Sequence, residues 1–115
     1  MSTLRTCAAQ GERFEGGLGI RDVILTRESP HDHVDLHEHT FDHVMFFAEG
    51  EATVTAHCPC GAVTVHEAKA GDSLLIPATW THGVVAKTER VKFWCVFAGF
   101  DASGQRQGDF TTEAR

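Results

Sequence analysis

Hydrophobic and polar residues alternate in short runs along this chain, and turn-forming residues separate the runs. Such alternation is typical of a β-strand with one buried face, because successive side chains of a strand point to opposite sides. No run shows the period of an amphipathic helix, and no internal repeat is present. The pattern predicts strands over 20–26, 44–48, 52–56, 62–66, 73–76, 82–86 and 91–97.

The segments between these runs indicate how the strands connect. The third and fourth predicted strands flank 57–61, which we expect to be the tip of a hairpin. Residues 1–19 are rich in glycine and are expected to form turns, and 101–115 is expected to be a loosely held polar tail. Short strands at close spacing predict one all-β domain over 1–115, a barrel or a sandwich.

Length, composition and charge narrow the class of protein. A chain of 115 residues with 42% hydrophobic and 23% charged residues is expected to be a single globular domain. A net charge of -6 argues against nucleic acid or a membrane surface as a partner, because both bind basic patches. No apolar run has the length of a signal peptide or a membrane span, so we expect a cytoplasmic protein.

Three of the histidines form a cluster in the sequence, and their spacing suggests metal binding. His37, His39 and His43 lie close together in the sequence, and His82 follows further along the chain. Residues two apart on a strand share a face and lie about 6.6 Å apart, so His37 and His39 can approach one ion. A straight strand would place His43 roughly 13 Å beyond His39, so the chain must bend at 40–42. The spacing predicts that these four histidines bind one divalent metal ion.

The first histidine segment resembles the first sequence motif of the cupin superfamily. That motif reads G(X)5HXH(X)3-4E(X)6G, and His37, His39 and Gly50 match its spacing. The leading glycine is absent, and His43 stands where the motif has its glutamate. The resemblance implies that His43 belongs to the ligand set.

The second segment resembles the second cupin motif, G(X)5PXG(X)2H(X)3N. Gly71, Pro77 and His82 match it, while Thr79 replaces its second glycine and Ala86 replaces its asparagine. The resemblance implies a double-stranded β-helix, or jelly-roll barrel of two antiparallel sheets, with the four histidines pointing inward. It also implies a homodimer, which the apolar outer positions Trp94, Val96 and Ala98 of the last strand favour independently.

Replacement of the motif glutamate by His43 changes the charge of the site. Four neutral imidazoles leave the charge of a divalent ion uncompensated, which favours an anionic or enolisable small-molecule ligand. In octahedral geometry, four protein ligands leave two positions for a chelating substrate, or for substrate and O₂. Imidazole suits Fe, Mn, Ni, Cu and Zn alike, so the predicted cofactor is one divalent transition metal ion per chain without a choice among them.

Apolar side chains are expected to surround this ion. Met45, Phe47, Trp80, Phe93 and Phe97 are candidates for a substrate pocket, with ordinary barrel core as the alternative. The chain has no tyrosine, which disfavours reactions that need a tyrosine base. The resemblance favours a dioxygenase acting on a diketone-like or other enolisable oxo compound. The alternatives are a non-redox isomerase or lyase and a non-catalytic module that binds a ligand or metal.

Two of the four cysteines flank a proline at the predicted hairpin tip. In a reducing compartment, cysteines are expected to be thiols or metal ligands rather than a disulfide framework. Cys58 and Cys60 could bind a second zinc or copper ion or be oxidised, and a free, exposed turn is the simpler alternative.

Overall fold

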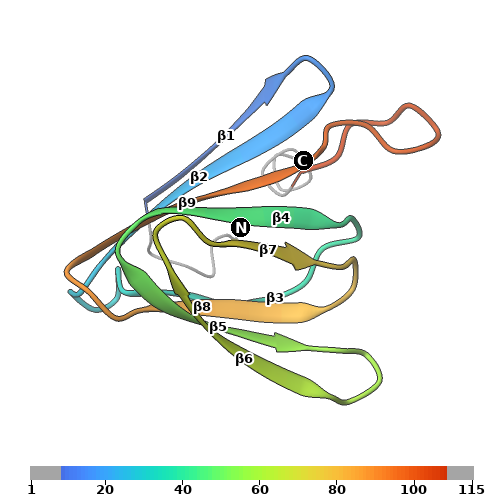
Figure 1. The fold of residues 1–115 in the computed structure, drawn as a ribbon. Helices are drawn as coiled ribbons and strands as arrows, with labels where there is room; N and C mark the ends of the chain where they lie inside the picture. The colour runs from blue at the N-terminus through green and yellow to red at the C-terminus, as the bar shows by residue number, and fades with distance from the viewer. Residues whose placement is uncertain (1–8, 109–115) are drawn as a thin grey trace.

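A computed structural model describes residues 9–108 of the chain as an all-β domain (Figure 1). The described residues contain no helix, and therefore none long and apolar enough to cross a membrane. The strands are β1 (Ala9–Glu15), β2 (Leu18–Thr26), β3 (His33–His37), β4 (His43–Glu49), β5 (Glu51–His57), β6 (Val63–Lys69), β7 (Ser73–Ile76), β8 (Thr81–Ala86) and β9 (Arg90–Ala98).

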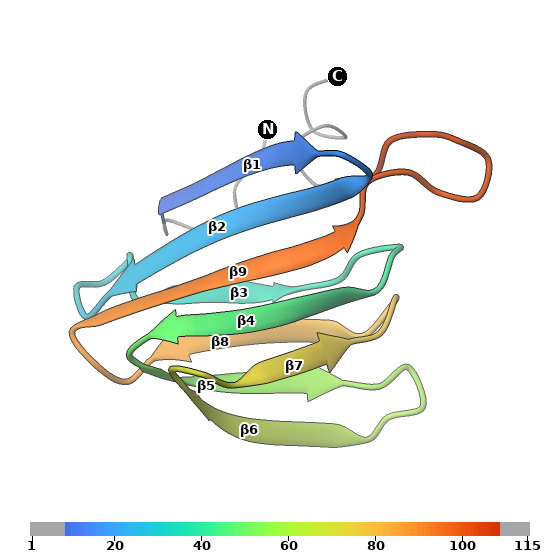
Figure 2. The ribbon, with the colours of Figure 1, turned by 45° about the horizontal axis from the view of Figure 1, so that its top comes forward.

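The strands form two antiparallel sheets that pack against each other. One sheet has five strands in the order β1-β2-β9-β4-β7, and the other has four in the order β3-β8-β5-β6. The predicted jelly-roll architecture of two antiparallel sheets is confirmed. Figure 2 shows that the connections β3–β4, β5–β6 and β7–β8 gather at one end of the barrel, which we call the site end.

Alternate residues of both sheets point inward and form the core. β2 and β9 each show an almost perfect alternation of buried and half-buried residues, as the sequence pattern of the last strand predicted. Burial of these apolar side chains supplies the main stabilisation of the fold. The buried hydrophobic residues are Val23, Leu25, Val34, Met45, Phe47, Ala52, Val54, Ala56, Ala68, Ile76, Val84, Ala86, Val91, Phe93 and Cys95, joined by Phe97.

Two parts of the chain differ from the expectations drawn from the sequence. The glycine-rich segment 1–19 was expected to form turns, but β1 pairs with β2 along its whole length, from Ala9↔Ile24 to Glu15↔Leu18. This strand depends on pairing with a neighbour rather than on its own weak alternation. Arg106 of the predicted tail 101–115 forms a β-bridge with Phe100, which lies just before the tail, and 109–115 lie outside the described residues.

Three turn positions of the cupin motifs require an unusual backbone. Gly50 has φ of 81° and Gly71 has φ of 97°, a region that glycine enters without steric cost. A Cβ at Gly50 would also lie 2.0 Å from the carbonyl oxygen of Arg90. Thr79, which replaces the motif's other glycine, has φ of 71° and is the only described non-glycine residue with a positive φ. Thr79 therefore adopts a conformation that glycine enters more readily.

The outward face of the five-stranded sheet carries an apolar patch, with Ser73 and Asp22 at the ends of one of its rows. Strand register places Leu75, Val44, Val96 and Ile20 in one row across β7, β4, β9 and β2. Phe46 and Trp94 lie opposite each other in the adjacent row. Leu75 is 63% exposed and Phe46 is 42% exposed. We call these six residues the outer apolar face.

Candidate metal centre

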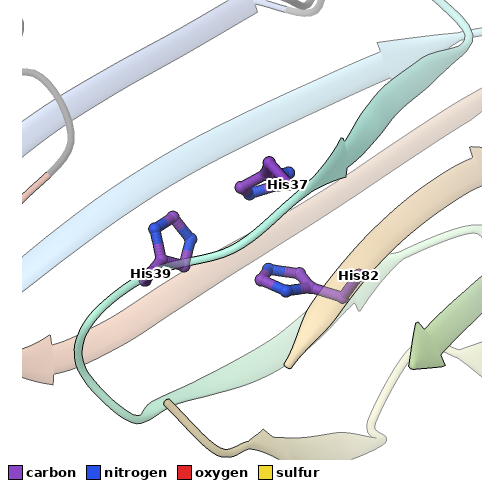
Figure 3. Close-up of side chains that lie close together, drawn as sticks. All are labelled: His37, His39 and His82. Atoms are coloured by element: carbon purple, nitrogen blue, oxygen red, sulfur yellow. The ribbon is translucent and has the colours of Figure 1, made fainter. Parts of the chain in front are cut away.

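Four histidines meet inside the barrel at its site end. His37 is the last residue of β3, and it is the strand partner of His82 near the start of β8. His39 lies just beyond β3, and His43 is the first residue of β4. The sequence analysis placed His37 and His39 on one strand, whereas the strand ends at His37. Figure 3 shows the rings of His37, His39 and His82 close together around one small space.

Three of these rings have the spacing of a metal site. One ligand atom each from His37, His39 and His82 can be chosen so that all lie within 4.8 Å of one another. Nitrogens bound to one ion at about 2.1 Å lie up to about 4.2 Å apart, so only a small contraction is needed. The ring centroids are 4.3 Å apart for His37 and His82 and 4.8 Å apart for His37 and His39. This donor set fits a divalent transition metal ion.

Backbone carbonyls orient two of the three rings. The Nδ1 of His37 lies 2.7 Å from the carbonyl oxygen of Asp35, and the Nδ1 of His82 lies 3.0 Å from that of Trp80. A carbonyl oxygen only accepts, so each Nδ1 carries the proton and donates it. Each Nε2 is then left with the lone pair that binds a metal.

Hydrogen bonds also join the two loops that carry the site. The backbone N–H of Thr79 donates to the carbonyl oxygen of His39 at 2.8 Å. The N–H of Ala78 donates to Oδ1 of Asp42 at 2.7 Å. The predicted bend at 40–42 is present, and its aspartate fixes the β3–β4 loop to the turn that precedes His82.

His43 lies beside the group of three but outside its 4.8 Å limit. Its ring centroid is 4.8 Å from that of His82 and 5.0 Å from that of His39. The side chain is only 2% exposed, and neither ring nitrogen has a hydrogen-bond partner. A buried nitrogen without a partner is costly. A metal ion within the cluster would provide the missing partner.

A buried arginine that the sequence analysis missed lies in the same interior. Arg21 of β2 is 4% exposed and lines a small cavity together with His37 and His82. Its position had a signal in the sequence, because Arg21 has the same strand parity as the buried residues Val23 and Leu25. A charge on the inward face of a strand is rare enough to indicate a function.

Comparison with solved structures decides the fold family. An oxalate decarboxylase from Lactobacillus farciminis, in complex with formate, aligns with 85% of this chain at a TM-score of 0.65 and 22% identity. A Bacillus subtilis oxalate decarboxylase with Mn(II) centres aligns with 93% of it at a TM-score of 0.66 and 19% identity. A cupin superfamily protein from Desulfitobacterium hafniense aligns with 85% of it at a TM-score of 0.65 and 16% identity.

This chain has the cupin fold. It spans only about a third of each decarboxylase chain (34% and 33%) but 83% of the Desulfitobacterium protein. At identities below 25% the likeness shows the fold alone. No protein-family model matches the sequence, and no curated protein matches it significantly.

Burial keeps His39, His43 and His82 neutral. Burial lowers the pKa of His43 to about 2 from its ordinary value of 6.5, with smaller contributions from His82 and Arg21. Burial, followed by the charge of Arg21, lowers the pKa of His39 even further. Burial also lowers the pKa of His82, although the carbonyl of Trp80 opposes this shift. Neutral imidazole is the form that binds a metal ion.

We expect the metal-free protein to lose stability on acidification. With the folded-state pKa of His39, His43 and His82 lowered, the unfolded chain binds more protons below about pH 6.5. Their contribution is therefore complete above that pH and is lost as the pH falls toward the folded-state values. At pH 5 the loss is up to about 2 kcal/mol for each histidine.

Urea unfolding at pH 7 and pH 5, with a chelator present, measures this loss. His33 has the opposite effect on stability, because its contact with Asp32 raises its pKa and protonation then favours the folded state. The His33→Gln variant lacks this gain, so its free energy of unfolding should fall more between pH 7 and pH 5 than that of the native protein. Equal free energies of unfolding at the two pH values in both proteins would contradict the prediction.

The predicted pocket residues divide into two groups. Met45 and Phe93 line the small cavity that also contains Arg21. Phe47 packs against Phe93, with ring centroids 5.1 Å apart, and belongs to the core away from that cavity. Phe97 is also buried, and Trp80 packs against the core while partly exposed.

A further aromatic residue, which the sequence analysis did not single out, borders the site. Phe41 stacks on His39 at 4.9 Å and on Phe97 at 4.5 Å. A hollow of about 250 Å³ opens beside His39 and Phe41, and Arg106 and Gln107 of the C-terminal segment form part of its wall. This hollow is the candidate entrance to the metal centre.

The cysteines do not all behave as the sequence analysis expected. Cys58 and Cys60 form a disulfide, which is the oxidised alternative of the sequence analysis rather than a free turn or a second metal site. Cys95 is a buried free thiol whose pKa burial raises to about 11. Cys7 lies outside the described residues. A cytoplasmic location stays a prediction.

Proposed function

We propose that this cupin binds one divalent transition metal ion and acts on a small carboxylate or enolate anion. His37, His39 and His82 would hold the ion, with His43 as the fourth ligand. The observation that carries the proposal is the buried group of three histidine ligand atoms with Arg21 lining the same small interior. A divalent ion supplies Lewis acidity when bound and stabilises negative charge that develops on a substrate.

Charge is the reason for expecting an anion. His39, His43 and His82 are held neutral, so the positive charges that line the site are those of the ion and of the Arg21 guanidinium. An anion bound in this buried interior would be attracted by both, because attraction between charges is stronger where water is excluded. The guanidinium can also grip a carboxylate through two parallel hydrogen bonds. A structurally similar protein, the Lactobacillus farciminis oxalate decarboxylase, has been solved in complex with formate, itself a carboxylate.

The surroundings of the cluster favour a small substrate that is shielded from water. Met45 and Phe93 make the inner wall of the cavity apolar, which strengthens each electrostatic contact inside it. Phe41, stacked on His39, limits access from the entrance. Oxygenation of an enolisable oxo compound is the reaction that we propose. Non-redox cleavage of a carboxylate is the second candidate, because Arg21 suits a substrate that keeps its negative charge throughout.

Metal analysis combined with two assays tests the function. Protein purified without added metal is expected to contain about one transition metal ion per chain. Oxygen uptake with a 1,3-diketone, measured on an electrode, would support the oxygenase. Release of CO₂ from oxalate without oxygen uptake would support the lyase. Protein that takes up no metal, either as purified or after incubation with Mn(II), Fe(II) and Zn(II), would overturn both.

Self-association through the outer apolar face completes the proposal. Leu75 and Phe46 are exposed on this face and its other four residues are half-buried, so it presents adjoining apolar side chains to solvent. Two copies packed face to face would cover it, as in a β-sandwich. The Phe46→Glu variant is expected to weaken association at least about 100-fold, because it buries a charge at the centre of the contact.

Sedimentation velocity at micromolar concentration measures this effect. The chain alone is 12.6 kDa, so the native protein should sediment as a species of twice that mass. Val65→Glu on the other sheet is the matched control, since Val65 is also an exposed apolar strand residue at 58% exposure. Equal dissociation by both variants, or a native monomer, would rule out this interface.

A further inference from the structure

The tip of the β5–β6 hairpin carries a disulfide between residues two apart. The N–H of Gly61 donates to the carbonyl oxygen of Cys58 at 2.8 Å, and the N–H of Cys58 donates to that of Ala62 at 2.9 Å. The sulfurs of Cys58 and Cys60 are bonded, and their Cα atoms are 5.0 Å apart. The turn is thus closed twice by the backbone before the disulfide is counted.

This disulfide contributes little to holding the fold. It closes a loop with a single residue, Pro59, between the cysteines, and stabilisation by a cross-link falls as its loop shortens. The two strands it joins are already paired along seven residue pairs, from Glu51↔Lys69 to His57↔Val63. Both cysteines also belong to the same turn, so the bond links no separate parts of the barrel. The bond is therefore better suited to thiol–disulfide exchange than to stabilising the fold.

The pair is open to attack by dissolved thiols. Cys60 is exposed, as are Pro59 and Gly61 on either side of it, whereas Cys58 is half-buried. The N–H of residue 60 donates to Sγ of Cys58 at 3.1 Å. A hydrogen bond to sulfur stabilises the thiolate, so Cys58 is the better leaving group and Cys60 the more accessible target. Cys95, buried with its pKa raised, has neither property.

We propose that Cys58 and Cys60 form a two-electron exchange site for small thiols of the glutathione class. A thiolate attacks Sγ of Cys60, forming a mixed disulfide and releasing Cys58 as thiolate. A second thiolate then attacks the sulfur of the small thiol in that mixed disulfide and releases Cys60. Two small thiols are oxidised to their disulfide, the protein disulfide is reduced to two thiols, and the reverse sequence restores it. The metal centre takes no part in these steps.

Thiol trapping in the folded protein tests the proposal. The native protein is equilibrated with mixtures of reduced and oxidised glutathione, quenched with N-ethylmaleimide, digested and analysed by mass spectrometry. Peptides containing Cys58 and Cys60 should change together from no label to two labels as the mixture becomes more reducing, and back again. Cys95 is the internal control and should stay unlabelled unless the protein is unfolded.

Single variants test the assigned roles of the two sulfurs. Cys60→Ser leaves Cys58 with the backbone N–H of residue 60, so its alkylation by iodoacetamide should reach half of its maximal rate at a lower pH than that of Cys60 in Cys58→Ser. Cys60 in Cys58→Ser should form a mixed disulfide with oxidised glutathione at least about 10-fold faster than Cys95 does. A pair that stays oxidised in folded protein at high glutathione, or that fails to re-form, would overturn the proposal. So would reaction of Cys60 as slow as that of Cys95.

Discussion

Replacing Arg21 with glutamine is expected to weaken the binding of a small carboxylate about 100-fold, or about 2.7 kcal/mol, while the metal content stays the same. The guanidinium lines the cavity beside His37 and His82, where water does not screen its charge. Glutamine keeps a hydrogen-bond donor but is shorter and carries no charge. The loss therefore measures the whole charged contact of the guanidinium.

Isothermal titration of manganese-loaded protein with oxalate and formate measures this change. Arg13→Gln is the matched control, because Arg13 lies on the adjacent strand but is exposed and paired with Glu15 and Asp22. Arg21→Lys should recover only part of the affinity, since an ammonium cannot make two parallel hydrogen bonds to a carboxylate. If Arg21→Gln loses metal, or binds oxalate as tightly as Arg13→Gln does, Arg21 is not the anion-binding group.

What the sequence predicted well depends on local pattern. Alternation of apolar residues in β9 determines which face of the strand is buried, so this strand was predicted together with its face, whereas β2 was predicted as a strand without one. The position of the bend at 40–42 followed from the reach of a strand and a turn-forming aspartate. Such features require no knowledge of which strand pairs with which.

What the sequence did not predict depends on pairing and burial. β1 is a strand because β2 provides its hydrogen bonds, and its own residues alternate poorly. Arg21 shares strand parity with Val23 and Leu25, but its place beside the histidines follows from the packing of β2 against the other sheet. Phe41 lies in a loop, where alternation gives no direction to a side chain, and its stacking on His39 follows from the tertiary fold. The Cys58–Cys60 bond was one of several possibilities that spacing left open.

The fourth histidine is where this chain departs from the cupin motif, and it provides the second strong test. The His43→Ala variant is expected to bind Mn(II) or Zn(II) at least about 100-fold more weakly, which corresponds to about 2.7 kcal/mol. Both ring nitrogens of His43 are buried without partners beside His39 and His82, so a ligand bond to the ion would satisfy one of them. His66→Ala is the control, because His66 is an exposed histidine on β6.

A glutamate at position 43 tests separately whether this side chain binds the metal and how its charge affects anion binding. His43→Glu restores the common motif and should keep its metal, because a carboxylate oxygen also binds these ions. Its negative charge offsets part of the ion's field and also attracts Arg21, so a carboxylate ligand should bind about 1–3 kcal/mol more weakly than in the native protein. Because burial lowers the pKa of His39, His43 and His82, these imidazoles stay neutral at about pH 6, and metal binding by the folded native protein should persist there.

The two substitutions together show whether His43 binds the metal ion or only packs beside the other histidines. If His43 only packs against the other rings, His43→Ala leaves a cavity, lowers the free energy of unfolding and keeps its metal. If His43 is a ligand, metal affinity falls in His43→Ala and recovers in His43→Glu, while anion affinity is reduced in both. Metal content measured by atomic emission, with oxalate titrations on the same samples, separates these outcomes. Full metal occupancy and unchanged oxalate binding in His43→Ala would leave a centre of His37, His39 and His82 alone.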